Sequence, residues 1–440
     1  MRLFGRKKNV EPEPIEETSP PPTLPTPPEP NDHGLRPWAA QRDWILDQIE
    51  PLPPFGMQLL DSLGLSLCEE IESDVSLPGF DNSAMDGYAV QAADTWNASE
   101  NAPATLAVVG EIAAGTVADR VLAPGTAMKI MTGAPVPEGA DTVVEYELTD
   151  RGAEDVNIFA QVDVDKNIRR KGSDIAEGEH LLSPGDIVDA RTVGLLAGIG
   201  IDKVLVRPRP RVVVLSTGSE LVEPGRALTD LGQLYDSNSF MLAAQARAAG
   251  AQVFRVGAVG DDPEKLTQTI TDQLLRADLI VTSGGISEGD WDVVKEVAPG
   301  LGLVDFAQIG MQPGKPQGFG LIGEDATPIL MLPGNPVSSF VSFEVFVRPA
   351  IRKLMGVTPL LRPTVTAVTA TIIRSKPGRA RFVRAGIRTD PGGRRVVEHV
   401  GDHSSHLLGG LQRANALLLV GDDVEVIAAG ETVHAWMLDE

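Results

Sequence analysis

Short apolar runs that alternate with helical patterns between residues 209 and 355 constrain the fold of this chain most strongly. The runs at 211–216, 253–256, 278–282 and 328–332 are rich in Val, Ile and Leu, and segments with helical character lie between them. Apolar strands separated by helices are typical of a parallel sheet that is covered on both faces. The sequence therefore predicts a multidomain α/β protein that contains a doubly wound domain.

Prolines in this region indicate where helices begin. Asp262 and Asn335 each precede a proline, a pattern that is typical of the first turn of a helix. We therefore expect helices from 263 to 276 and from 336 onward, with a kink or break at Pro349.

The flanking segments have a different character. Short strand patterns with Gly and Pro turns predict a β-rich domain, which lies between two segments of a connector domain, and a small β-barrel at the C-terminus. A helix that starts near Trp38 and a second short helix at 56–63 are expected in the connector. The predicted boundaries are 35–78 with 174–207 for the connector domain, 79–173 for the β-rich domain, 208–361 for the doubly wound domain and 362–440 for the barrel.

Residues 1–34 are predicted to be a disordered, proline-rich tail. Residues 11–30 hold nine prolines and five glutamates and have almost nothing to bury. Four basic residues at positions 2–8 precede this stretch. We interpret them as a solvated tip, and the alternative is a weak anchor for an acidic surface or a protein partner.

The composition excludes several classes of function. Lys plus Arg number 38 and Asp plus Glu number 61, so the net charge is −23 and nucleic acid is not an expected partner. The single cysteine, Cys68, excludes an internal disulfide and a Cys-rich metal site. No stretch approaches the length of an apolar membrane span, and no apolar core follows the basic start as it would in a secretion signal. We expect a cytoplasmic protein.

Four glycine-rich loops follow the predicted strands of the doubly wound domain. The carboxyl ends of such strands meet at one edge of the sheet, where ligands bind. Glycines let backbone N–H groups approach an anion, and helix N-termini favour negative charge. One such loop is weak evidence, but four at one edge predict an anion site. The candidate binding residues are Ser216, Thr217 and Gly218; Ser283, Gly284, Gly285 and Ser287; Pro313, Gly314 and Lys315; and Pro333, Gly334, Asn335 and Pro336.

Acidic residues lie on the same loops as the predicted anion site. Carboxylates beside a phosphate repel it unless a cation lies between them, and Mg²⁺ is the usual cation. Asp262 and Asp290 are expected to be helix caps. Glu220 and Asp292 have no such role, so they are the candidate metal ligands.

Two stretches of the β-rich region also carry charged clusters. Asp81 and Asp86 lie in an acidic turn that leads into an apolar strand, and three cations at 169–171 stand close to Asp174 and could hold an anion. The alternative for the first stretch is an Asx-rich turn with only a structural role. Three histidines at positions 399, 403 and 406 have helical spacing but lie in a strand-and-loop pattern, so we do not expect a metal site there.

Together these motifs resemble those of the MoeA and gephyrin E-domain family, the molybdopterin molybdenumtransferases. The resemblance covers residues 37–440, and its motifs follow the order found in the family. They are 81–89 (Asp-Asn-Ser-Ala-Met-Asp-Gly-Tyr-Ala), 131–137 (Met-Thr-Gly-Ala-Pro-Val-Pro), 216–220, 283–287, 313–316 and 332–336.

The resemblance implies an elongated four-domain subunit, with a MogA-like doubly wound domain, that works as a homodimer. It implies an enzyme that takes adenylylated molybdopterin and molybdate, inserts molybdenum at the dithiolene and releases AMP with Mg²⁺. The implied site lies between the doubly wound domain of one subunit and the β-rich domain of the other. The acidic positions implied as catalytic are Glu220, Asp261 and Asp292 on one side and Asp86 and Asp174, with Thr132 beside them, on the other.

The chain departs from the family at one place. Many members carry lysines where this chain has Gln308 and Gln312, whereas Lys315 remains. Either amides, Lys315 and the cations at 169–171 hold the substrate, or its affinity is reduced. Two other functions stay open. One is a gephyrin-like scaffold that binds partner proteins through the tail or the module, and the other, which we disfavour, is a molybdopterin adenylyltransferase.

Overall fold

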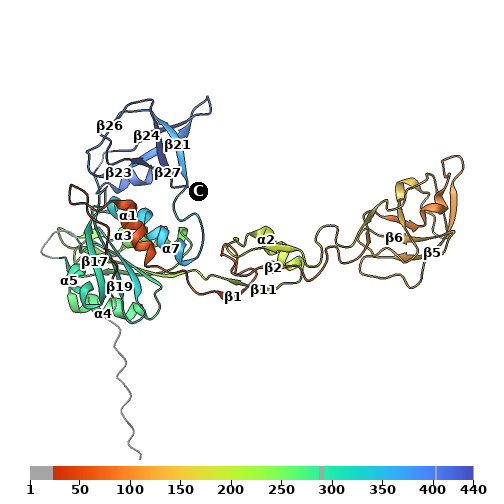
Figure 1. Cartoon of the computed structure of the whole chain (residues 1–440), viewed down its shortest axis with the longest axis horizontal. Helices are drawn as coiled ribbons and strands as arrows, with labels where there is room; N and C mark the ends of the chain where they lie inside the picture. The colour runs from red at the N-terminus through yellow and green to blue at the C-terminus, as the bar shows by residue number, and fades with distance from the viewer. Residues whose placement is uncertain (1–22, 287–291, 402–403, 440) are drawn as a thin grey trace, which may run out of the picture. The chain divides into compact units, whose positions relative to one another are not determined.

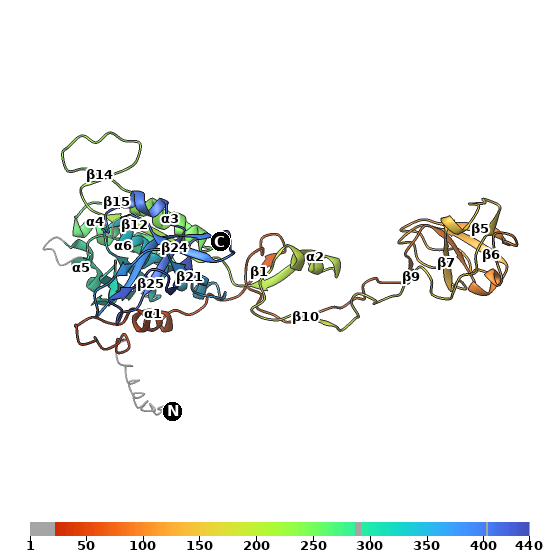
Figure 2. The same ribbon diagram turned by 90° about the horizontal axis from the view of Figure 1, so that it is seen from above.

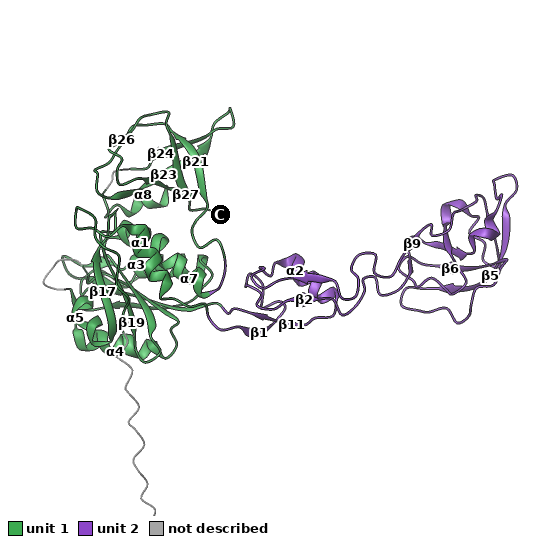
Figure 3. Ribbon diagram, viewed as in Figure 1, with its two compact units in different colours: residues 1–51, 209–354, 358–440 green, residues 52–208, 355–357 purple. Residues whose placement is uncertain are grey.

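The computed structural model describes residues 23–286, 292–401 and 404–439 (Figure 1). The chain forms two compact units (Figure 3). Unit 1 comprises residues 1–51, 209–354 and 358–440, and unit 2 comprises residues 52–208 and 355–357. Among the described residues, no helix has the length and apolar character that crossing a membrane requires. The finer division into four domains and a tail stays a prediction.

Unit 1 contains a six-stranded sheet that confirms the predicted α/β fold class. Its strands follow the order β15-β12-β16-β20-β19-β17. The first four strands are parallel, as predicted: β15 (Gln252–Val259), β12 (Arg211–Thr217), β16 (Leu279–Ser283) and β20 (Thr327–Leu332).

The last two strands are β19 (Pro316–Ile322) and β17 (Gly302–Gln308). Strand β19 pairs antiparallel with both β20 and β17, so the sheet is mixed, whereas a wholly parallel sheet was expected. The glycines of β19 concealed this strand in the sequence. A Cβ at Gly318 would lie 2.8 Å from the ring of Phe306, and one at Gly320 would lie 2.5 Å from Val304 Cγ1. Large side chains of β17 fill the space that side chains on β19 would otherwise occupy.

Helices cover both faces of this sheet (Figure 1). Leu266 of α4 and Val294 of α5 join Val213, Ile280 and Met331 of the strands in one fully buried cluster. The opposite face carries α3 and the last helical segment. The helices are α3 (Asn238–Ala248), α4 (Pro263–Leu274), α5 (Val293–Val297), α6 (Pro336–Ser342) and α7 (Arg348–Leu354), with a π-helical turn at Phe343–Val347 between the last two.

The helix starts follow the sequence signals with one difference. The Asp262 carboxylate accepts a hydrogen bond of 3.1 Å from the backbone N–H of Lys265, so it caps α4 as predicted. Asn335 occupies the cap position of α6, but its side chain makes no cap hydrogen bond. The predicted break near Pro349 is present as the π-helical turn that ends just before α7.

The C-terminal segment of unit 1 forms a closed five-stranded barrel, as predicted. Strand β23 pairs with both β24 and β25, and this double pairing closes the ring. A short strand of the sheet domain, β18 (Met311–Gln312), pairs with β23. The barrel strands are β21 (Thr364–Thr369), β23 (Ala380–Thr389), β24 (Arg395–His399), β25 (Ala416–Val420) and β27 (Thr432–Met437), with β22 (Ile373–Arg374), β26 (Val426–Ile427) and α8 (Leu408–Gln412) between them.

The segment before and within α1 (Trp38–Asp47) also belongs to unit 1. Residues 31–34, which we assigned to the tail, form a turn in which the Asn31 side-chain oxygen accepts from the N–H groups of His33 and Leu35. The Asn31 amide donates to the carbonyl of Gly378 in the barrel at 3.3 Å. The Trp38 ring packs edge-on against Phe382, with 5.3 Å between the ring centroids. The N-terminal segment therefore ties the barrel to the sheet domain.

Unit 2 contains a five-stranded sheet in the order β7-β4-β6-β5-β8 and a set of two-stranded sheets. The predicted helix at 56–63 is wrong, because Phe55–Gln58 is a strand, β1, that pairs with β11 and is followed by a turn. Prolines precede the segment, and β11 is available as a partner strand, so the extended form is favoured over a helix of only eight residues. The remaining elements are β2 (Ile71–Glu72), β3 (Asn82–Ser83), β4 (Gly87–Val90), β5 (Ala104–Ile112), β6 (Thr126–Ile130), β7 (Thr142–Glu145), β8 (Asp155–Ile158), β9 (Ile168–Arg169), β10 (His180–Leu182), α2 (Ala190–Gly198) and β11 (Lys203–Val206).

Candidate active site

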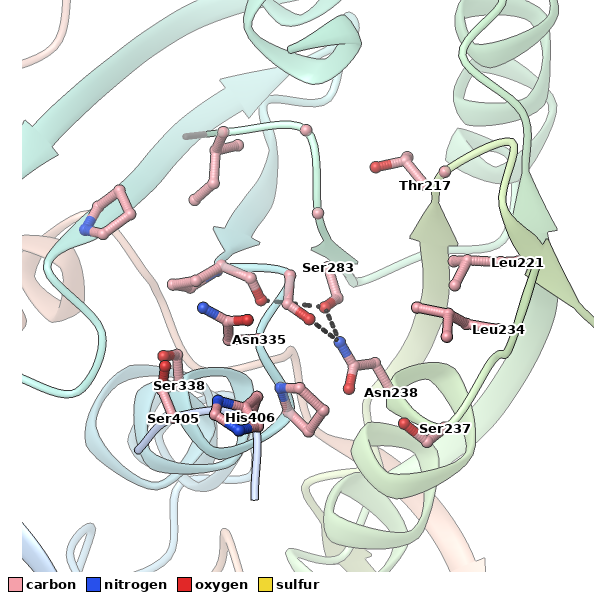
Figure 4. Close-up of a pocket in the computed structure, with 18 of the residues that line it drawn as sticks. Thr217, Leu221, Leu234, Ser237, Asn238, Ser283, Asn335, Ser338, Ser405 and His406 are labelled. Carbon is pink, nitrogen blue, oxygen red and sulfur yellow. Dashed lines mark hydrogen bonds between the residues drawn. The ribbon is translucent and has the colours of Figure 1, made fainter. Parts of the chain in front are cut away.

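A cavity of about 1200 Å³ lies at the carboxyl edge of the sheet in unit 1 (Figure 4). All four glycine-rich loops that the sequence singled out line it. The sequence-predicted residues at its wall are Thr217, Gly218, Glu220, Asp261, Ser283, Gly284, Gly285, Asp292, Pro313, Gly314, Lys315, Pro333, Gly334, Asn335 and Pro336. The structure therefore brings these residues together, while their roles in catalysis stay predictions.

Two predicted binding residues are not on this wall. Ser216 is buried behind it, and its hydroxyl donates to the carboxylate of Asp236 at 3.0 Å. Ser287, together with the expected cap Asp290, lies outside the described residues.

The loops at Gly284 and Thr217 are packed directly against each other. A Cβ at Gly284 would lie 2.7 Å from the carbonyl oxygen and 2.9 Å from the hydroxyl oxygen of Thr217. The backbone of Gly284 also has a φ of +99°, so only glycine fits here without strain. Among the described atoms the buried Thr217 hydroxyl has no hydrogen-bond partner, and Thr217 is one of the residues that line the cavity (Figure 4). A ligand oxygen is its natural partner.

A buried hydrogen-bond network fixes the floor of the cavity. The Asn238 amide nitrogen donates to Ser283 Oγ at 2.9 Å and to the carbonyl of Gly334 at 2.7 Å. The hydroxyls of Ser283 and Ser339 lie 2.9 Å apart. This network joins α3, β16 and the loop before α6, so the site is held in place before any ligand binds. The sequence analysis missed Asn238 because it read the residue only as part of a helix.

The acidic residues reach the cavity from separate loops. Asp261 and Ser219 bond reciprocally, since the N–H of Ser219 donates to the Asp261 carboxylate at 2.9 Å and the Ser219 hydroxyl accepts from the N–H of Asp261 at 3.0 Å. A Cβ at Gly218 would lie 2.5 Å from the Glu220 carboxylate, so the glycine makes room for that group. Asp292 precedes α5, and its Oδ2 lies 4.0 Å from Lys295 Nζ.

The barrel contributes a third kind of lining residue that the sequence analysis did not assign. Ser404, Ser405 and His406 lie at the cavity. The N–H of Val337 in α6 donates to the carbonyl of Ser405 at 3.0 Å. The buried Arg384 guanidinium donates to the carbonyl of Leu407 at 2.6 Å. The first bond joins the barrel loop to the sheet domain, and the second fixes the loop to barrel strand β23.

Of the other two histidines in the 399–406 stretch, the structure describes only His399. The His399 ring is 3.3 Å from the Thr371 hydroxyl, and His403 lies outside the described residues. Within the described ranges, the His, Cys, Asp and Glu side chains form no group of three or more that could hold a metal.

Only one of the two glutamines that replace family lysines lies at the cavity. Gln312 and Lys315 both line it. Gln308 is not among the lining residues; its carbonyl accepts from the N–H of Arg36 at 2.9 Å on the edge strand β17. The departure at Gln312 therefore lies at the cavity, whereas the departure at Gln308 does not.

The predicted acids of the β-rich region belong to unit 2. Asp86 accepts from the N–H and the hydroxyl of Thr132 at 2.7 and 2.8 Å. These two bonds, the backbone one first, hold the pKa of the Asp86 carboxyl below its usual value. Asp174 is exposed, and its N–H donates to the carbonyl of Leu77 at 3.0 Å. Because the two units are separate, a site that combines them stays a prediction.

One of the three cations at 169–171, near Asp174, is already engaged in ion pairs. Arg170 forms ion pairs with both Asp81 and Asp165. The N–H of Lys171 donates to the Asp81 carboxylate at 2.7 Å, and this bond is the first cause of the lowered pKa of Asp81. Arg170 therefore has less charge to offer an anion than the sequence suggested.

Three family models cover most of the chain. The MoeA N-terminal region (domain I and II) matches residues 36–200, the probable molybdopterin binding domain matches 213–353, and the MoeA C-terminal region (domain IV) matches 366–438. The middle match contains most of the cavity wall, and the last match contains Ser404, Ser405 and His406.

Curated relatives and solved structures agree with these matches. Molybdopterin molybdenumtransferase 2 of Mycobacterium tuberculosis is 43% identical over 400 residues, which is 90% of this chain and 97% of the relative. The molybdopterin molybdenumtransferase of Haemophilus influenzae is 34% identical and covers 89% of this chain and 96% of its own length. The crystal structure of a molybdopterin biosynthesis MoeA protein from a Pyrococcus species has a TM-score of 0.78 at 30% identity and covers 92% of this chain and 100% of that chain.

The fold and the cavity thus define a multidomain α/β protein with a cavity of glycine-rich loops and carboxylates at the edge of its sheet. The chain belongs to the MoeA family of molybdopterin molybdenumtransferases, as the sequence motifs predicted, and hence to the enzymes of molybdenum cofactor biosynthesis.

Proposed function

We propose that this chain inserts molybdenum from molybdate into adenylylated molybdopterin, with Mg²⁺-dependent release of AMP. The observation that carries the proposal is the cavity of unit 1. It combines glycine loops and one lysine, which suit phosphate oxygens, with carboxylates from three loops, which suit a cation. This pairing of opposite charges is expected where a metal bridges protein and phosphate.

The residues present fit a magnesium ion that is completed by its substrate. Mg²⁺ is usually bound through one or two carboxylates, with substrate phosphates and waters as the other ligands. Glu220 and Asp292 would hold it, and Asp261 lines the same cavity. When bound, the ion neutralises charge that develops on the leaving phosphate.

The chain's own groups would hold and orient the phosphates of the substrate. The backbone at Gly284 and Gly285 and the Lys315 ammonium would hold the phosphates. The buried Thr217 hydroxyl, which has no partner among the described atoms, would bond one of their oxygens. This division gives the acids a catalytic role and the glycine loops a binding role.

We further propose that Asp86, Asp174 and Thr132 complete the site from a second copy of the chain. Light scattering should give the mass of a homodimer. A monomer at micromolar concentration would argue against a shared site. We expect the enzyme to work in the cytoplasm.

The direct test is to supply adenylylated molybdopterin, Mg²⁺ and molybdate. We expect AMP release, a requirement for Mg²⁺, and a product that activates a molybdenum-free apoenzyme. Absence of AMP and of active cofactor, from protein that still binds the substrate, would contradict the proposal.

The scaffold function remains a second candidate because Gln312 stands at the cavity where many relatives of the family carry lysine. A neutral residue there suits relaxed catalysis. The same assay separates the two functions, because a scaffold without catalysis releases no AMP.

A further inference from the structure

A loop of unit 1 leaves the cavity wall and returns to it. It runs from residue 223 to 233 between two short strands, β13 (Leu221–Val222) and β14 (Leu234–Tyr235), which pair in parallel with Leu221 opposite Leu234. Figure 2 shows the loop standing out beside β14. A loop whose two ends lie together is an Ω-type loop, and such loops are frequently functional.

One guanidinium holds both ends of this loop. Arg255 Nη1 donates to Glu223 Oε2 at 3.2 Å, and the same nitrogen lies 4.0 Å from Oδ2 of Asp236. It also donates to the Ser239 hydroxyl at 3.1 Å, and the guanidinium carbon lies 3.9 Å above the centre of the Phe240 ring. Glu223 begins the loop and the fully buried Asp236 follows it, so Arg255 fixes where the loop leaves and re-enters the wall.

The backbone is shaped to bring Arg255 to this point. Between β12 and β15, Val214 pairs with Arg255 and Leu215 pairs with Gly257, so Val256 is an extra residue. Gly257 has a φ of +94°, which a residue with a Cβ rarely adopts. Bulges of this kind are rare in parallel pairs, re-aim a side chain and occur next to active sites. The bulge therefore indicates that the position of Arg255 matters.

The held ends present an apolar surface to the cavity. Leu221, Leu234 and Tyr235 line it, and Figure 4 shows Leu221 and Leu234 side by side, below Thr217. Leu234 is 59% exposed and Tyr235 is 47% exposed, which is high for side chains that line a cavity. An apolar wall next to phosphate-binding loops suits a flat ring that is linked to a phosphate.

We propose that Leu221, Leu234 and Tyr235, held by Arg255, bind the planar nitrogen heterocycle of the substrate. This inference rests on the proposed function, whose substrate carries two such rings, an adenine and a pterin. The three side chains determine specificity by contact with the ring. Arg255 is a positioning residue, since it acts through the loop ends.

The test compares ligands with and without a ring in the full-length protein. Calorimetric titration measures the affinity for AMP, molybdopterin and inorganic pyrophosphate. Leu234→Ser should weaken binding of one ring-bearing ligand about tenfold, as the loss of a buried aliphatic contact does, and leave pyrophosphate within twofold. Leu231→Ser is the matched control, because Leu231 is fully exposed in the same loop and does not line the cavity.

The ligand that responds identifies the ring. A loss confined to AMP assigns the wall to adenine, and a loss confined to molybdopterin assigns it to the pterin. If wild-type protein binds both and Leu234→Ser changes neither by more than twofold, the inference is wrong while the proposed function stands. If wild-type protein binds neither ligand nor the adenylylated substrate, the proposed function fails first.

A second variant tests the clamp itself. Arg255→Met should speed tryptic cleavage after the exposed Arg226 in the loop, and it should raise the KM for adenylylated molybdopterin more than it lowers kcat. AMP or molybdopterin should slow that cleavage in the wild type. Unchanged cleavage and an unchanged KM in a folded variant would overturn the positioning role.

Discussion

The acidic residues of unit 1 and those of unit 2 are supported in different ways. Glu220, Asp261 and Asp292 lie on loops that close around one cavity and are fixed by bonds between loops. Asp86 and Asp174 are exposed. The Asp86 carboxylate accepts a hydrogen bond from Thr132, which lies in the turn after β6. Unit 1 therefore presents a formed cavity lined by its predicted acids, whereas the predicted acids of unit 2 stand on exposed turns.

Substitutions in the loops of unit 1 should therefore cost more than substitutions in the exposed turns of unit 2. In unit 1 the loops contact one another so closely that a single methyl group disturbs the site. In unit 2 the turn at Gly133, beside Thr132, has open space around it, since nothing lies within 4 Å of a Cβ at that position.

The largest effect is expected from the acids of the cavity. Asp292→Asn or Glu220→Gln keeps the shape of the side chain but loses the charge that Mg²⁺ needs, so AMP release should fall about a hundredfold or more. Steady-state AMP release across a Mg²⁺ titration measures this. Asp262→Asn is the control, because Asp262 caps α4 and an asparagine caps equally well. Normal activity at normal Mg²⁺ in both acid variants would remove these residues from the site.

The cation of the cavity comes next. Lys315→Ala loses a charge-assisted contact to an anion, which costs about 1.5 to 3 kcal/mol, or roughly ten- to a hundredfold in affinity. Binding of adenylylated substrate and of molybdate should be measured separately to learn which anion the loop holds. Both affinities within twofold of the wild type would show that this loop binds neither.

The glutamine substitutions sharpen that experiment. Gln312→Lys should tighten anion binding, because Gln312 lines the cavity beside Lys315. Gln308→Lys should have little effect, because Gln308 is not among the lining residues. Equal tightening by both variants would contradict the placement of these two residues.

Alanine substitutions at two glycines compare the packing around one loop of unit 1 with that around one turn of unit 2. Gly284→Ala would put a Cβ 2.7 Å from the Thr217 carbonyl at a φ of +99°. Strain and overpacking together should lower the stability of unit 1 by about 2 to 4 kcal/mol. Gly133→Ala, at a φ of +81° with nothing within 4 Å, adds strain alone and should cost unit 2 about 1 to 2 kcal/mol. Hydrogen exchange of the core strands in each unit measures both, and equal losses would argue against the close contact.

The smallest effect concerns the pKa of Asp86. Its carboxylate is stabilised by Thr132, so its contribution to stability is present above the ordinary pKa of an aspartate and is lost as pH falls through the lowered value. Thr132→Val removes the hydroxyl bond but keeps the larger backbone bond, so the NMR titration midpoint of Asp86 should rise part of the way. Thr132→Ser should leave it in place. A midpoint that does not move in Thr132→Val would show that the hydroxyl bond is not made.

The glycine-rich loops of the cavity could be predicted from the sequence, whereas His406 and the role of Asn238 could not. Gly284 and Gly334 could be brought to one edge because parallel strands end on the same side of a sheet. His406 could not, because the barrel brings it there through tertiary packing that no local pattern encodes. Asn238 looked like an ordinary helix residue, since its role depends on the Ser283 hydroxyl across the sheet edge.

Two structural errors have equally local causes. The glycines at 318 and 320 weakened the strand signal of β19, although the packing of β17 requires them. The segment at 56–63 was too short for its periodicity to separate a helix from a strand, and the pairing with β11 decided it.

The central claim is that loops far apart in the sequence form one phosphate-binding site in unit 1. Hydrogen exchange with and without adenylylated molybdopterin and Mg²⁺ tests it most directly. We expect the backbone amides around Thr217, Gly284–Gly285, Gly314–Lys315 and Gly334 to exchange more slowly with substrate bound. The amides in the last turn of α4, at the end of the helix away from Asp261, should be unchanged. Protection that avoids these loops while the substrate is bound would contradict the account.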